Sequence, residues 1–217
     1  MKKILMTCLV IGLMVPTVIA FSPGSFYDTF TSAPITMPKP EKRAASIDIN
    51  EVISEVTEKT QSIDSSVQKT FLDIAAKLST NNDATGLKNK IDMILSDTTK
   101  SQTEQNTIVN QVLSDYTAGL IQNKDSVSAI ASTLSAADKK SVMDDITELG
   151  KLAQEYSKLQ KKELNIKDLL SALRNKNERE NLASQLSALG SLLSNRGSST
   201  LSMASQLAQL AKIAGIN

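Results

Sequence analysis

The sequence predicts an all-α protein: an elongated bundle of about five to six amphipathic helices after a signal peptide and a Pro-rich extended segment. Three observations support this fold class. From Asp48 onward, apolar residues recur at steps of three and four, which places them on one face of successive helices. No proline follows Pro40, so nothing of that kind interrupts a helix. No stretch of the same region alternates with the period of two that is typical of a strand.

Composition restricts both the core and the chemistry. Of the 217 residues, 41% are hydrophobic but only 3% are aromatic, so the core must consist mainly of Leu, Ile, Val and Ala. The chain has no His, and its single Cys, Cys8, lies in the predicted leader. The remainder therefore lacks the residues for disulfides, Cys/His zinc sites, Cys nucleophiles and His-dependent triads. The net charge of +1 argues against a nucleic-acid partner, which requires a basic surface.

Residues 1–20 are typical of a signal peptide. Two lysines follow the initial Met, an almost wholly apolar run comes next, and small residues precede a cleavage site after Ala20. A retained membrane anchor is one alternative, but the apolar run is short for a span and Pro16 interrupts it. Lipoprotein acylation at Cys8 is another, but too few apolar residues precede that position. We expect a secreted, extracellular protein, or a periplasmic one in a Gram-negative bacterium.

Residues 21–46 differ sharply in composition and include four of the five prolines. Proline at this density blocks helix and favours extended, solvated backbone, so we predict a disordered linker. The alternative is a binding role, in which aromatic side chains dock on a partner or on lipid. The candidate binding residues are Phe21, Phe26, Tyr27 and Phe30.

A dibasic pair, Lys42-Arg43, ends the Pro-rich segment. Such a pair is typical of cleavage by processing proteases of eukaryotic secretion. If it is cut, residues 21–43 are a pro-segment and the mature chain starts at Ala44. The linker and pro-segment interpretations both remain open at this point.

The first long helix is predicted from Asp48 to Leu78, with Asp48 as its N-cap and Glu51 at the spacing of a capping box. Its apolar stripe is too long to be buried within one helix, so the later segments must cover it. An extra residue between Val67 and Phe71 interrupts the near-heptad spacing. We therefore expect a bundle within one chain, a single domain over residues 47–217, rather than a long supercoil.

The remaining helices are predicted from their caps and turns. A second helix is expected over about residues 84–122, with an almost entirely polar middle at 96–107 that indicates a break or an exposed centre. A solvated bend and a hydrophilic patch for a partner are both compatible with that middle. Four further segments are predicted after it. They are a short helix, a helix capped by Ser135, a segment capped by Asn165 and ended by the polar turn 195–199, and a last helix over 201–214.

Paired carboxylates are the only catalytic material present in quantity. Asp144 and Glu148 lie four residues apart on one predicted helix, beside Asp145, and could share a cation or act as acid and base. A solvated acidic face balanced by nearby lysines explains the same pattern. We favour that explanation and expect no enzyme, no cofactor and no metal site.

The favoured function is therefore a secreted, non-enzymatic helical interaction protein: an adhesin, an effector or a wall- or surface-associated binding module. Its partner would be another protein or a cell or wall surface. The alternative is a lipid- or hydrophobic-surface-binding protein whose bundle opens at a membrane or interface. A hydrolase that uses carboxylates alone is a distant third hypothesis.

Overall fold

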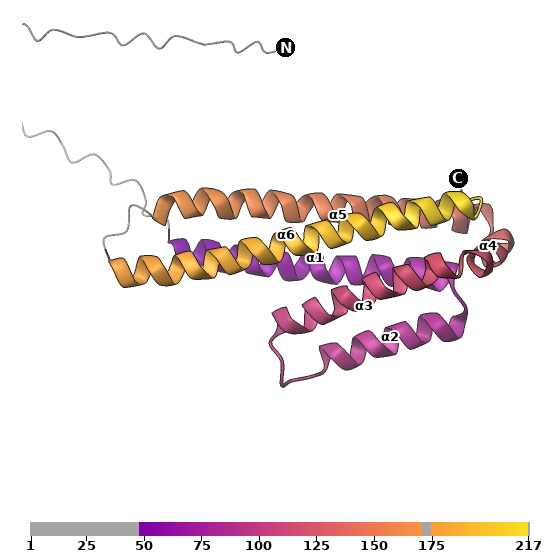
Figure 1. Cartoon of the computed structure of the whole chain (residues 1–217), viewed down its shortest axis with the longest axis horizontal. Helices are drawn as coiled ribbons and strands as arrows, with labels where there is room; N and C mark the ends of the chain where they lie inside the picture. The colour runs from indigo at the N-terminus through magenta and orange to yellow at the C-terminus, as the bar shows by residue number, and fades with distance from the viewer. Residues whose placement is uncertain (1–47, 171–174, 217) are drawn as a thin grey trace, which may run out of the picture. The chain divides into compact units, whose positions relative to one another are not determined.

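The computed structural model describes residues 48–170 and 175–216. Within these residues it contains six helices and no strand, which confirms the all-α prediction (Figure 1). The predicted signal peptide, the Pro-rich segment and the dibasic pair lie outside the described residues. So do all the site residues proposed from the sequence: Ala20, Phe21, Phe26, Tyr27, Phe30, Lys42 and Arg43.

Helix α1 (Ile49–Leu78) begins and ends at the predicted residues, with Asp48 as its N-cap, but Glu51 does not complete the predicted capping box. The Asp48 side chain accepts a hydrogen bond of 2.9 Å from the Asn50 amide and so caps the first turn. The predicted stripe faces inward, because Val56, Val67, Phe71, Ile74 and Leu78 are all buried. This stripe forms one wall of the main core.

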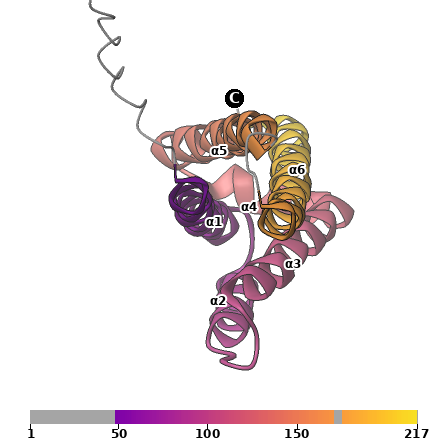
Figure 2. The same cartoon turned by 90° about the vertical axis from the view of Figure 1, so that its left-hand side faces the viewer.

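Four helices surround that core. The long helices α5 (Ala136–Leu169) and α6 (Lys176–Ile213) pack against each other, and α5 also packs along α1 (Figures 1 and 2). Helix α3 (Gln102–Gln122) contacts α6 and α1. Helix α2 (Asn81–Leu95) lies outside these four, against α1 and α3, and the short α4 (Lys124–Thr133) contacts α1, α3 and α6. None of the described helices is both long enough and apolar enough to cross a bilayer.

The prediction of one helix over residues 84–122 is wrong, because the polar middle breaks it into α2 and α3. Asp97 turns the chain by accepting a 3.0 Å hydrogen bond from the Thr99 amide. Ser101 and Glu104 then form a capping box that starts α3. The break and the exposed bend that the polar composition indicated are confirmed, and the two helices return antiparallel to each other.

Two other predicted boundaries are wrong, because the helices continue through them. Helix α5 does not restart at Asn165 but runs on to Leu169. Helix α6 begins at Lys176, inside the segment predicted to start at Asn165, and continues through the supposed turn at 195–199 into the predicted last helix. A Cβ added at Gly197 would lie 3.2 Å from the Tyr156 Cβ, so glycine allows α6 and α5 to approach closely here. Packing, not turn formation, explains this glycine.

Candidate functional site

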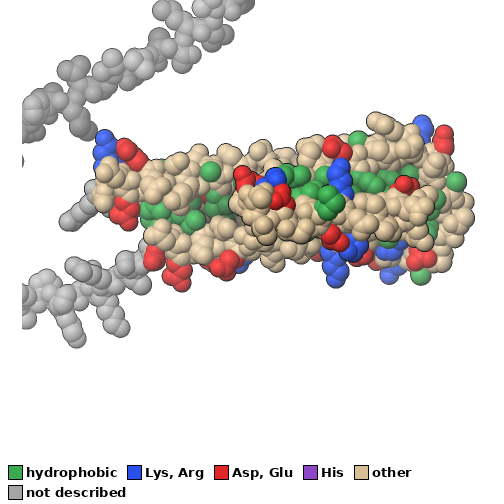
Figure 3. Space-filling view, turned by 90° about the horizontal axis from the view of Figure 1, so that it is seen from below, with side chains coloured by type: hydrophobic (Ala, Val, Ile, Leu, Met, Phe, Trp, Pro, Cys, Tyr) green, Lys and Arg blue, Asp and Glu red, His purple; other side chains and the backbone are tan. Residues whose placement is uncertain are grey.

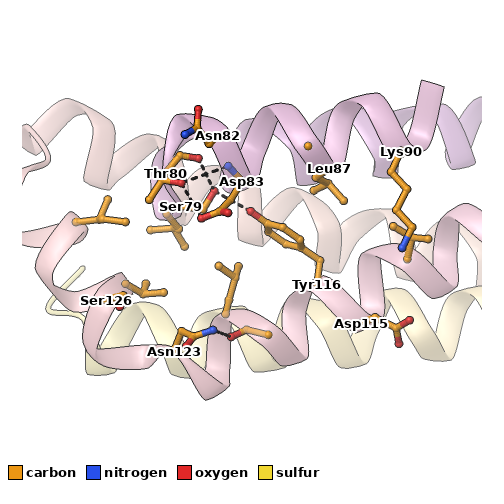
Figure 4. A pocket seen from close by; sticks show the side chains of 17 residues that line it. Ser79, Thr80, Asn82, Asp83, Leu87, Lys90, Asp115, Tyr116, Asn123 and Ser126 are labelled. Atoms are coloured by element: carbon orange, nitrogen blue, oxygen red, sulfur yellow. Dashed lines mark hydrogen bonds between the residues drawn. The ribbon is translucent and has the colours of Figure 1, made fainter. Parts of the chain in front are cut away.

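A cavity of about 650 Å³ lies between α2, α3, α4 and the end of α1. We call it the hairpin cavity. Its aliphatic lining consists of Leu78, Leu87, Val112, Leu120, Val127 and Ile130, and its exposed polar rim of Asn82, Asp83, Lys90, Asp115, Asn123 and Ser126 (Figure 4). Figure 3 views the face on which α2 lies and shows hydrophobic side chains open to solvent among charged ones. An apolar interior with a few polar groups at its edge is typical of a ligand site.

Tyr116 is the aromatic wall of the hairpin cavity. Its hydroxyl donates a 2.8 Å hydrogen bond to Ser79 Oγ, and Ser79 Oγ in turn donates to the Ala75 carbonyl at 2.6 Å. Behind it, the buried Phe71 ring meets Tyr116 edge-on, with centroids 6.1 Å apart and planes at 76°. Burial raises the pKa of Tyr116, and the Asp83 carboxylate adds to that effect. Tyr116 is therefore fixed in place and protonated at neutral pH.

Two glycines on opposite helices also line the hairpin cavity: Gly86 on α2 and Gly119 on α3. A Cβ added at either position would meet no atom within 4 Å outside its own local backbone. Packing therefore does not require glycine at either place. Glycine inside a helix is less stable than alanine by about 1 kcal/mol. The absence of side chains at these two positions leaves the cavity wider at some cost in helix stability.

A second feature is a polar network buried in the middle of the bundle. Each of the four core helices contributes one member: Asp64 from α1, Asn106 from α3, Tyr156 from α5 and Arg196 from α6, none more than 5% exposed. The Tyr156 hydroxyl donates to Asp64 Oδ1 at 2.6 Å, and Asn106 Nδ2 donates to Oδ2 at 3.0 Å. Arg196 forms an ion pair with Oδ2 and donates to the Thr103 carbonyl at 3.1 Å.

Burial and the hydrogen-bond donors of this network shift the pKa of Asp64 in opposite directions. Burial raises the pKa of Asp64, while the Arg196 guanidinium and the hydrogen bonds from Tyr156 and Asn106 act in the opposite direction. Burial and the Asp64 charge together raise the pKa of Tyr156, which keeps its hydroxyl protonated. A void of about 10 Å³ lies beside Asp64, and a larger cavity of about 240 Å³ adjoins Asn106 and Arg196. The hydrogen bonds and the ion pair at Asp64 join the four helices.

The acidic group that the sequence analysis considered lies on the surface of α5. Asp145 pairs with Lys77 of α1 at 3.0 Å, and Glu148 pairs with Lys151 at 3.1 Å. Among the described residues, no group of three or more Cys, Asp or Glu side chains is arranged to hold a metal ion. Asp145 and Glu148 are each paired with a lysine, and the partner of Asp145 comes from α1, which spacing along α5 could not identify.

Sequence reasoning missed both structural features. A signal for the network existed, because Asp64 interrupts the apolar stripe of α1 beside Ile63. The hairpin cavity had a weaker signal, the isolated Gly86 and Gly119 inside helical patterns. Comparisons of the chain with models of known families, with curated proteins and with solved structures find no match.

Proposed function

We propose that this chain is a secreted, non-enzymatic helical interaction protein, such as an adhesin, an effector or a surface-associated binding module, that holds an apolar group of its partner in the hairpin cavity. The observation behind this proposal is the cavity itself. Its volume of about 650 Å³ falls within the range of ordinary ligand sites, about 300–1,000 Å³. The partner would be a protein or a group on a cell or wall surface.

The construction of the cavity supports binding. Its aliphatic lining comes from four different helices. An apolar group of a partner that enters there would leave water, and this transfer favours association. Tyr116 is already fixed by Ser79 and Phe71, so little side-chain freedom is lost when a partner enters. Preorganised apolar surface beside exposed polar groups provides both affinity and orientation.

Lipid- or hydrophobic-surface binding by an opened bundle is the second candidate. Exposed apolar side chains such as Met93, Leu201 and Ile213 favour contact with an apolar surface. Opening, however, would separate helices that the network of Asp64 and Arg196 joins. Exposing that ion pair to lipid would be costly, so we rank this function below binding by the closed bundle.

Filling the hairpin cavity is expected to abolish the binding of an apolar probe. The neutral fluorophore N-phenyl-1-naphthylamine should bind the full chain, and the double substitution Gly86→Leu and Gly119→Leu should weaken binding by at least about tenfold. The new side chains would occupy the space that the probe needs, and one tenfold change corresponds to about 1.4 kcal/mol of lost contact. Fluorescence titration measures the affinity, and circular dichroism checks that the bundle remains helical.

Gly150→Leu is the matched control for this experiment. Gly150 also lies inside a helix with open space around its added Cβ, but it does not line the hairpin cavity. This variant should bind the probe as the unaltered chain does. Unchanged affinity in a folded Gly86→Leu, Gly119→Leu variant would show that the probe binds elsewhere and would remove the basis of the proposal.

Secretion makes a separate prediction about the N-terminus of the exported protein. Cleavage by signal peptidase should leave Phe21 as the first residue, and further cleavage after Arg43 should leave Ala44. N-terminal sequencing and intact mass of the protein recovered from the medium distinguish the two. A protein that stays in the cell with its first twenty residues attached would contradict the secreted assignment.

A further inference from the structure

The charges around the hairpin cavity are unevenly distributed. Asp83 and Asp115 lie on its rim, one on each side of the cleft between α2 and α3, and Lys90 is the basic residue there (Figure 4). The rim therefore has one more negative than positive charge. An electrostatic preference for one sign of ligand charge follows from such an arrangement.

Both carboxylates are oriented but not neutralised. Asp83 accepts a 2.7 Å hydrogen bond from the Thr80 hydroxyl, and Asp115 accepts one of 2.8 Å from Gln111 Nε2. Within the part of the chain that the structure describes, no Lys or Arg nitrogen lies within 4.0 Å of either carboxylate. The half-buried Asp97 and Asp145 differ from them, because each has a lysine partner.

An aromatic ring lies beside one of these acids. The Tyr116 hydroxyl points toward Asp83, whereas Asp115 lies on the other side of Tyr116, toward Lys90 (Figure 4). An aromatic face attracts a cation through its quadrupole, and that attraction adds to the attraction of the Asp83 carboxylate. A cation held there could extend an attached apolar chain over the aliphatic lining.

We propose that the group received by the hairpin cavity is an apolar chain that bears a positive charge, as in a Lys or Arg that follows apolar residues in a protein partner. This inference rests on the proposed function and adds the sign of the charge to it. Asp83 and Tyr116 select the cation, Asp115 adds negative charge to the rim, and the aliphatic lining takes the chain. Lys90 lies on the same rim and weakens this selection.

Displacement of N-phenyl-1-naphthylamine by three octyl compounds tests the inference on the full chain. Octylamine, octanol and nonanoate share one octyl chain and carry a positive, a neutral and a negative head group at neutral pH. Octylamine should displace the fluorophore at a concentration about two- to fivefold lower than octanol, the range expected for exposed charge pairs. Nonanoate should require the highest concentration, and added salt should reduce the differences.

Three variants locate the effect. The double substitution Asp83→Asn and Asp115→Asn should remove the preference for octylamine, and Lys90→Gln should increase it. Asp144→Asn is the matched control, since it removes one exposed carboxylate from α5 and should leave the preference intact.

The possible results distinguish a failure of the charge preference from a failure of the proposed binding function. Equal displacement by all three compounds, or stronger displacement by nonanoate, would overturn the charge preference while leaving the hairpin cavity as a binding site. If the fluorophore itself does not bind, both proposals fail. If the preference for octylamine persists in the variant with both Asp83→Asn and Asp115→Asn, the preference arises at another surface. That result would also overturn the inference.

Discussion

Replacing Asp64 with alanine is expected to lower the free energy of unfolding by about 3–5 kcal/mol, because it leaves the Arg196 guanidinium buried without its counter-ion. The same substitution removes the acceptor for Tyr156 and Asn106, two further buried donors. Urea unfolding followed by far-ultraviolet circular dichroism measures the loss. The effect should exceed that of any exposed ion pair in the bundle.

Two controls separate the network from charge removal in general. Glu148→Ala breaks the exposed pair with Lys151 and should cost about 0–1 kcal/mol. The double substitution Asp64→Leu and Arg196→Met should be markedly more stable than Asp64→Ala, because a buried pair replaced by apolar side chains leaves no unpaired charge. An Asp64→Ala variant as stable as Glu148→Ala would mean that the pair is not held in the interior.

Replacing Phe71 with alanine is also expected to destabilise the bundle by about 3–5 kcal/mol, as for large-to-small changes in a packed core. Phe71 is completely buried and packs edge-on against Tyr116. The substitution should affect function as well, because Tyr116 would lose the ring behind it. Urea unfolding gives the stability change, and fluorophore titration shows the accompanying loss of affinity at the hairpin cavity.

Phe71→Leu is the matched variant, since it keeps most of the apolar volume. It should cost less than about 1.5 kcal/mol. A Phe71→Ala variant that loses no more stability than Phe71→Leu would contradict the position of this ring at the centre of the core. Normal probe binding by a folded Phe71→Ala variant would show that the position of Tyr116 does not depend on it.

Helix identity and the start of α1 could be predicted because both depend on residues close in sequence. The Asp48 cap and the buried stripe through Phe71 arise within one helix, where spacing alone is informative. The continuity of α6 could not be predicted in this way. Its residues 195–199 favour a turn locally, but Gly197 packs against Tyr156, and Arg196 binds Asp64 across 132 positions of sequence. Tertiary contacts outweighed the local preference.

Neither part of the candidate site was predictable, for a related reason. Spacing along one helix identifies Asp64 as an unusual polar residue but does not identify Asn106, Tyr156 and Arg196 as its partners. The hairpin cavity depends on the position of α2 relative to α3, which follows from the polar break between them, and Gly86 and Gly119 leave it wider. A cavity is space left between helices, so no motif specifies it.

Stability is distributed unequally between α2 and the rest of the bundle. Only Leu87 and Ile91 of α2 are buried, and α2 contributes nothing to the network that joins the four core helices. Helices with few buried contacts open locally at low free energy while the remainder stays folded. The hairpin cavity therefore has one compliant wall and one rigid wall. Partners of somewhat different size could be accepted by small movements of α2, with the core left undisturbed.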